Sequence, residues 1–181
     1  MKKSLVVALL ILVVGTTAYS QQDKGDVNVT FSGTYTSNKL YSFGQIFIKG
    51  GYFVTKNIEA GIKPQFLFGD GFSGTGVGLY GTYNFLTKDA KLVPYAGAEI
   101  NHSSLKSGGG EESGKMKQTN MGLYGGSKYF ITESLNVDAG MNFSFNLASN
   151  PSEMDLGMIF QFQVGVGFIV GNVNKKKVVA E

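Results

Sequence analysis

Hydrophobic and polar residues alternate along several long stretches of the chain, a period of two that predicts β-strands with two unlike faces. The stretch "VNVTFSGTY" is the first example. Its apolar face carries Val27, Val29, Phe31 and Tyr35, and the positions between them are Asn28, Thr30, Ser32 and Thr34. The same alternation runs from Leu135 to Leu147 and from Leu156 to Val170. Both of these stretches exceed the roughly 5 to 6 residues usual for strands in globular proteins.

Five further stretches complete a set of eight predicted antiparallel strands. They cover about 40–54, 58–69, 74–86, 92–103 and 118–131. Pro64 and Pro94 fall inside two of these segments, and each removes one ladder hydrogen bond. We therefore expect a bulge or a strand end at both prolines.

A short motif recurs between the predicted strands, as "YFVTKN" at 52–57, "YNFLTK" at 83–88 and "YFITES" at 129–134. The three copies join the second strand to the third, the fourth to the fifth and the sixth to the seventh, so they share one end of an up-and-down meander. At the other end the connections are more variable, and the longest covers 106–118. Short turns opposite longer loops, an even strand number and many aromatic residues are typical of a transmembrane β-barrel. The aromatics predicted to lie at the membrane interface are Tyr52, Phe53, Tyr83, Phe85, Tyr129 and Phe130.

Composition supports one all-β domain. The 181 residues include 26 glycines, 9 tyrosines and 14 phenylalanines, with 3 prolines and no cysteine or tryptophan. The absence of cysteine excludes a disulfide framework, thiolate metal sites and a cysteine nucleophile. All 16 basic residues are lysines and the net charge is only +3, which disfavours nucleic-acid binding. We expect no cofactor.

The N-terminal segment predicts secretion. Lys2 and Lys3 precede an apolar run from Leu5 to Val14, and small residues stand at Ala18 and Ser20. Ten apolar residues would span roughly 15 Å as a helix, about half the hydrocarbon thickness, so a cleaved signal peptide is preferred over an anchor. The predicted organisation is a signal peptide at 1–20, a barrel domain at 21–171 and a lysine-rich periplasmic tail at 172–181.

The polar strand faces predict the content of the barrel interior. A strand with an apolar face toward lipid cannot leave its backbone groups unpaired, so the sheet has to close, and the polar faces then line the lumen. The charged residues on those faces are Lys49, Lys63 and Lys128 with Glu59, Glu99 and Asp138. Isolated ions there would be costly, so we expect a mutually paired cluster that plugs the lumen and leaves no open pore.

From residue 25 to residue 171 the sequence resembles the small eight-stranded outer-membrane β-barrel proteins, the group of OmpX, OmpW and the membrane domain of OmpA. The resemblance is carried by "GYFVTKNIEAGI", "KYFITESLNVDAGM", "LYGTYNF" and "LVPYAGAEI". The ending "AYSQ" of the predicted signal peptide is similar to those of Bacteroidetes-type secreted proteins. The resemblance implies a structural or surface-interaction role and supplies no catalytic residues. It departs from the family pattern at the C-terminus, where Phe168 is followed by "IVGNVNKKKVVAE" in place of a terminal aromatic residue.

An enzymatic alternative rests on the only histidine. His102 and Ser104 stand two apart, hence on one strand face, and this H-x-S arrangement resembles the outer-membrane lipid A deacylases. That resemblance would make His102 the base and Ser104 the nucleophile. The nearby acids, Glu111 and Glu112, belong to a glycine-rich loop and not to the next strand, so we do not expect an enzyme.

A second alternative is a soluble, lipocalin-like barrel with its apolar faces inward and a small apolar ligand inside. The glycine-rich polar face suits a narrow interior better than a solvated exterior, which favours the membrane barrel. We therefore expect a monomer in the Gram-negative outer membrane, in contact with outer-membrane lipid and lipopolysaccharide and inserted by the barrel assembly machinery. The longest loop, 106–118, is the expected contact region for an external partner.

Overall fold

Eight β-strands make up the fold. The computed structural model describes residues 22–37, 42–69, 71–86, 91–107, 115–150 and 158–171. The strands are β1 (Val27–Ser37), β2 (Ser42–Phe53), β3 (Ile58–Gly69), β4 (Phe72–Asn84), β5 (Leu92–Ser107), β6 (Lys115–Phe130), β7 (Leu135–Asn150) and β8 (Met158–Val170). The predicted strands are confirmed in number and order, and their bounds differ by a few residues. The predicted signal peptide and the tail after Gly171 lie outside the described residues.

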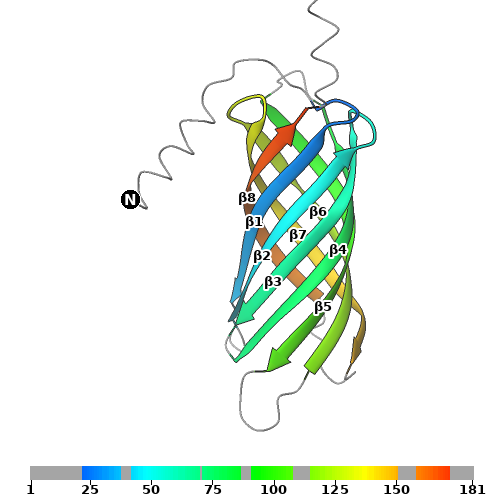
Figure 1. The fold of residues 1–181 in the computed structure, drawn as a ribbon. Coiled ribbons are helices and arrows are strands. Elements are labelled where there is room, and N and C mark those ends of the chain that lie inside the picture. The colour runs from blue at the N-terminus through cyan, green and yellow to red at the C-terminus, as the bar shows by residue number, and fades with distance from the viewer. Residues whose placement is uncertain are drawn as a thin grey trace, which may run out of the picture.

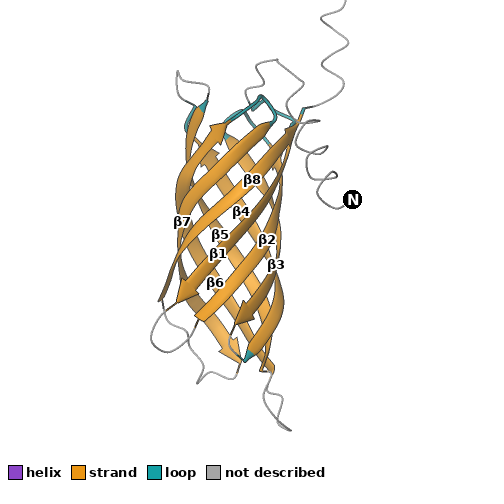
Figure 2. Cartoon of the chain, turned by 90° about the vertical axis from the view of Figure 1, so that its left-hand side faces the viewer, coloured by secondary structure: helices purple, strands orange, loops and turns teal. Residues whose placement is uncertain are grey.

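The strands form one closed antiparallel barrel in sequence order (Figures 1 and 2). Each strand pairs with the next along the chain, and β1 closes the sheet by pairing with β8, where Val27 lies opposite Val170. Closure leaves no edge strand with unpaired backbone groups. No helix among the described residues is long and apolar enough to cross a membrane.

The two ends of the barrel are built differently. The end that holds the β2–β3 and β6–β7 connections, here the turn end, also holds residue 22 and residue 171 and lies uppermost in Figure 1. The other end is here the loop end. The repeated threonine has the same task in both turns, because Thr55 Oγ1 accepts a hydrogen bond from the Ile58 amide (3.0 Å) and Thr132 Oγ1 accepts one from the Leu135 amide (3.0 Å). The motif is thus a turn in which threonine replaces a missing backbone partner.

Side chains segregate by face as the alternation predicts. Large apolar residues lie exposed on the outer wall along all eight strands, among them Phe31, Ile46, Ile62, Leu79, Ile100, Leu123, Phe143 and Phe162. Polar and charged residues are buried inside, among them Asn28, Lys49, Glu59, Asn84, Glu99, Lys128, Asp138 and Gln163. This polarity contradicts the lipocalin-like alternative, which requires an apolar interior.

Two of the six predicted interface aromatics are on the wrong face for that role. Tyr52 and Tyr129 are about half exposed on the outer wall, but Phe53 and Phe130 are buried inside the barrel, with Phe53 0% exposed. Consecutive strand residues point to opposite faces, so a Tyr-Phe pair cannot place both rings in lipid. In the copy at 83–88 Asn84 takes the inward position, and Tyr83 and Phe85 both point outward with their ring centroids 5.0 Å apart.

The expectation for Pro64 was also wrong. Phe47 pairs with Gln65 and Gly50 pairs with Ile62 in one unbroken register, so Pro64 interrupts the ladder without a bulge. Pro94 is the third residue of β5, near a strand end as expected. The register shift that the described pairings do contain lies between Thr119 and Asn120.

Candidate functional site

All six charged residues predicted for the lumen are inside the barrel and buried. Lys49, Glu59 and Lys63 come from β2 and β3, whereas Glu99, Lys128 and Asp138 come from β5, β6 and β7. The barrel brings them together because the inward positions of strands far apart in sequence face one another across a narrow lumen. They form two ion pairs and one separated pair of charges.

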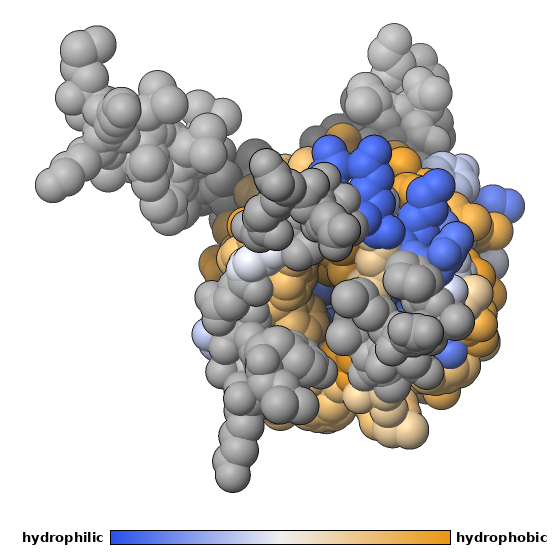
Figure 3. Space-filling view, turned by 90° about the horizontal axis from the view of Figure 1, so that it is seen from below, coloured by the Kyte–Doolittle hydropathy of each residue, from blue (hydrophilic) through white to orange (hydrophobic). Residues whose placement is uncertain are grey.

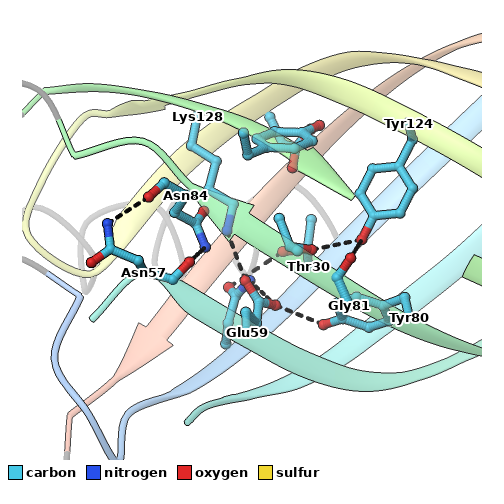
Figure 4. A network of polar contacts seen from close by, with 12 residues as sticks. Thr30, Asn57, Glu59, Tyr80, Gly81, Asn84, Tyr124 and Lys128 are labelled. Atoms are coloured by element: carbon cyan, nitrogen blue, oxygen red, sulfur yellow. Dashed lines mark hydrogen bonds and ion pairs between the residues drawn. The ribbon is translucent and has the colours of Figure 1, made fainter. Parts of the chain in front are cut away.

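The first ion pair joins Glu59 and Lys128, whose Oε2 and Nζ atoms are 2.9 Å apart (Figure 4). The other carboxylate oxygen of Glu59 accepts hydrogen bonds from Tyr80 Oη (2.7 Å) and Asn28 Nδ2 (2.9 Å). Three donors from three strands thus converge on one carboxylate. Such satisfaction is what a buried charge requires, because an unpaired one carries a large desolvation penalty.

The second ion pair joins Glu99 and Lys63 at 2.6 Å. The same Oε1 atom also accepts hydrogen bonds from Asn101 Nδ2 and Asn142 Nδ2, each at 2.7 Å. Glu99 therefore repeats the arrangement of Glu59, with one lysine and two neutral donors.

Lys49 and Asp138 do not join each other. Asp138 Oδ1 accepts a hydrogen bond from Tyr95 Oη at 2.6 Å, and Gln163 Nε2 donates to the same tyrosine oxygen at 3.0 Å. The ammonium of Lys49 lies 4.8 Å from the ring centroid of Tyr124, and Phe47 and Tyr80 also flank it. Among the described residues Lys49 forms no ion pair, and the three aromatic rings around its ammonium are placed to stabilise it by cation–π contacts.

Tyrosines are the part of this network that the sequence reasoning missed. Tyr80, Tyr95 and Tyr124 form a buried cluster inside the barrel. All three stand at inward positions of the alternation, so strand parity could have identified them. The aromatic residues of the chain were considered only as exposed rings at the membrane interface, and none was predicted to lie in the lumen.

Two apolar clusters flank the polar layer. Phe53, Val93, Phe130 and Ile169 pack together at the turn end. Leu67, Leu105 and Met116 pack together at the loop end, with Phe72 against them. The lumen therefore contains an apolar cluster, a polar network and a second apolar cluster in succession. Within the described ranges no three His, Asp or Glu side chains are grouped so that they could hold a metal ion.

His102 and Ser104 lie on the outer wall of β5, as the alternation predicts. The Nδ1 atom of His102 is 3.0 Å from Thr119 Oγ1 on β6. The cross-strand partners of His102 are Val77 and Thr119, and those of Ser104 are Thr75 and Lys117. None of these four is an acid that could orient the histidine, and Glu111 and Glu112 lie outside the described residues.

Comparison with known proteins agrees with this architecture. The family model described as "Outer membrane protein beta-barrel domain" matches residues 6–168. The chain is similar in structure to the N-terminal β-barrel domain of Pseudomonas aeruginosa OprF, with 23% identity, a TM-score of 0.68, and 82% of this chain and 100% of that chain covered. It is also similar to Neisserial surface protein A, with 16% identity, a TM-score of 0.64, and 79% and 95% covered. No curated protein sequence matches the chain.

Proposed function

The chain belongs to the outer membrane protein beta-barrel domain family, and on this premise we propose that it is a closed, non-conducting barrel of the Gram-negative outer membrane with a structural or surface-interaction role. The turn end faces the periplasm and the loop end faces outward, since short turns are periplasmic in such barrels. The exposed apolar wall lies in lipid, and the tyrosines of the repeated turns lie at the periplasmic interface.

The closed lumen is supported above all by the three side-chain hydrogen bonds that each of Glu59 and Glu99 accepts. The donors are side chains on other strands and, for Glu99, also Asn101 on the same strand. These hydrogen bonds hold lysine, tyrosine and asparagine side chains across the middle of the lumen. An ion passing this layer would have to displace them. The apolar clusters on both sides add a second barrier, because an ion loses its hydration there without gaining a partner.

Purified mature protein in planar bilayers tests this proposal. We expect no steady high conductance from the parent chain. A variant with Glu59→Ala and Lys128→Ala should conduct more than the parent only if the apolar clusters and the Glu99–Lys63 pair do not block the lumen by themselves. An SDS gel of unheated and boiled samples first verifies that both proteins form a heat-modifiable barrel. A large, steady single-channel conductance from the parent protein contradicts the closed lumen.

The surface role is assigned to the loop between β5 and β6. These two strands have 16 residues each, longer than β1 to β4, and they include 106–107 and 115–118, so the connection between them is shorter than the predicted 106–118 and covers 108–114. Deletion of residues 108–114 should leave heat-modified mobility unchanged and abolish binding of the cells to their partner surface. Unchanged binding after the deletion removes the loop from the proposal.

No enzymatic activity is proposed, because the H-x-S pair has no acid at its cross-strand positions. Mass spectrometry of lipid A from cells expressing the parent chain and His102→Ala tests this point. The two lipid A profiles should be the same, whereas loss of an acyl chain only with the parent protein contradicts the assignment.

A further inference from the structure

Three lysines gather on the outer wall at the loop end. Lys106 on β5 lies directly opposite Lys115 on β6, and Lys117 follows two residues later on the same face of β6. All three are exposed. Like charges directly opposite each other destabilise a strand pair. An anion between the ammonium groups would therefore remove a repulsion between these two strands.

The surroundings of this lysine cluster (Lys106, Lys115 and Lys117) are polar and carry no described negative charge. Ser73 on β4 is the other cross-strand partner of Lys106, and Asn150 on β7 is that of Lys117. Ser104, opposite Lys117 on β5, adds a hydroxyl. No described carboxylate forms an ion pair with the cluster. The wall thus offers cations and hydrogen-bond donors to an external anion.

The height of the cluster follows from the strand geometry. An apolar band about 25 Å tall, crossed by strands tilted about 40°, takes up about 33 Å of strand, or about ten residues. Leu92 on β5 and Tyr129 on β6 are paired at the turn end, and ten residues farther along their strands stand His102 and Thr119, which are also paired. The lysine cluster begins just beyond this second pair. It therefore lies at the level of the lipid headgroups.

Other strands carry aromatic side chains at this level. The same count along β3, β7 and β8 reaches Phe68, Phe145 and Phe160, all exposed on the outer wall. The same count along β4 from Tyr83 reaches Ser73, so the outer wall at this level carries aromatic side chains on β3, β7 and β8 and polar ones on β4, β5 and β6. Seen from the loop end, hydrophilic residues gather on one side of an otherwise hydrophobic wall (Figure 3). The cluster is a local feature and not a property of the whole rim.

We propose that Lys106, Lys115 and Lys117 bind a phosphate group of lipid A, the phosphorylated lipid of the outer leaflet, against the wall of β5 and β6. Ammonium groups bind phosphate as point charges, and the hydroxyls of Ser104 and Ser73 donate hydrogen bonds to its oxygens. The inference uses the membrane orientation given with the proposed function. Each lysine near an anionic lipid surface contributes roughly a fivefold change in affinity.

Native mass spectrometry of the mature chain in non-ionic detergent with EDTA tests the site. The probes are lipid A with its phosphates and the same lipid after enzymatic dephosphorylation. The test variant carries Lys106→Gln, Lys115→Gln and Lys117→Gln. A matched control carries Lys24→Gln, Lys56→Gln and Lys91→Gln, which removes the same charge from exposed positions at the turn end. Heat-modified mobility on SDS gels reports the folding of every variant and is independent of lipid binding.

We expect the parent chain to prefer the phosphorylated lipid, the test variant to lose at least tenfold in affinity for it, and the control to retain the parent affinity. Equal affinity of the parent chain for both lipids, or equal losses in the two variants, overturns the proposal. A third variant, Glu111→Gln with Glu112→Gln, should bind lipid A as well as the parent or better. A loss there assigns binding to the loop carboxylates and also overturns the lysine site. The proposed closed barrel survives any of these failures if mobility and conductance are unchanged.

Discussion

Removing one partner of the Glu59–Lys128 pair should cost far more than removing both. In Glu59→Gln the buried ammonium of Lys128 loses the carboxylate with which it forms its ion pair, and its described neighbours are then the cross-strand Asp138 and the rings of Phe53 and Tyr95, whose centroids lie 5.6 and 5.7 Å away. Breaking a buried pair in this way costs about 3 to 5 kcal/mol of unfolding free energy. Lys128→Met should lower the free energy of unfolding by the same amount, because it leaves the buried Glu59 carboxylate without its lysine.

The double variant Glu59→Gln, Lys128→Met should lie within about 2 kcal/mol of the parent, because both charges of the pair are removed together and neither is left without its partner. The coupling energy from the four proteins should therefore exceed about 3 kcal/mol. Urea unfolding from lipid vesicles measures it, followed by far-UV circular dichroism since the chain has no tryptophan. The exposed Lys56→Met is the control and should change stability by about 0.5 kcal/mol or less. Single variants within about 1 kcal/mol of the parent would mean that water solvates the pair and would refute the reasoning.

Two further predictions use the same unfolding titration. A Cβ added at Gly140 would lie 2.6 Å from Tyr95 Oη, so Gly140→Ala should lower the free energy of unfolding by about 1 to 3 kcal/mol. A Cβ added at Gly81 meets nothing within 4 Å, so Gly81→Ala should leave the stability close to that of the parent. Equal effects of the two substitutions would contradict a tightly packed lumen. Thr132→Ala removes the hydrogen-bond acceptor of the Leu135 amide and should lower the free energy of unfolding by about 0.5 to 1.5 kcal/mol. Thr132→Ser keeps a hydroxyl at this position and should restore most of that loss. Equal stability of the two variants would contradict the role given to the repeated threonine.

The alternation predicted the strands and the inward face of the six lumen charges, but it did not predict that Lys106, Lys115 and Lys117 lie on strands, because 106–118 was expected to be a loop. Period two is a strong signal here because the outer wall meets lipid along long strands, so apolar residues recur without interruption, as from Met158 to Val170. The same parity would have corrected the two buried phenylalanines of the repeat. Phe53 and Phe130 were assigned to the membrane interface because each follows a tyrosine, and their position in the alternation was not used.

The partners of each lumen charge could not be predicted from the sequence. Parity gives the face of a residue, but its height in the barrel depends on tilt and stagger, which link strands that are distant in the chain. Lys128 meets Glu59, 69 positions away, whereas its cross-strand neighbour Asp138 binds Tyr95 instead. Pro64 was misjudged for a similar reason, because a closed barrel tolerates an interrupted ladder where the register continues on both sides.

The charges of this barrel include an inner set, in which both glutamates form ion pairs with lysines, and an outer set of lysines at the loop end that form no ion pair with a described carboxylate. Inside, Glu59 and Glu99 bind Lys128 and Lys63, so these charges stabilise the fold and have little capacity left for a ligand. Outside, the lysine cluster forms no ion pair with a described carboxylate, and its strands flank the connection at 108–114. Specific contacts with lipid or with an external partner are therefore expected on the wall and loops of β5 and β6. Substitutions in the lumen should change stability, and substitutions in the lysine cluster should change binding with little effect on stability.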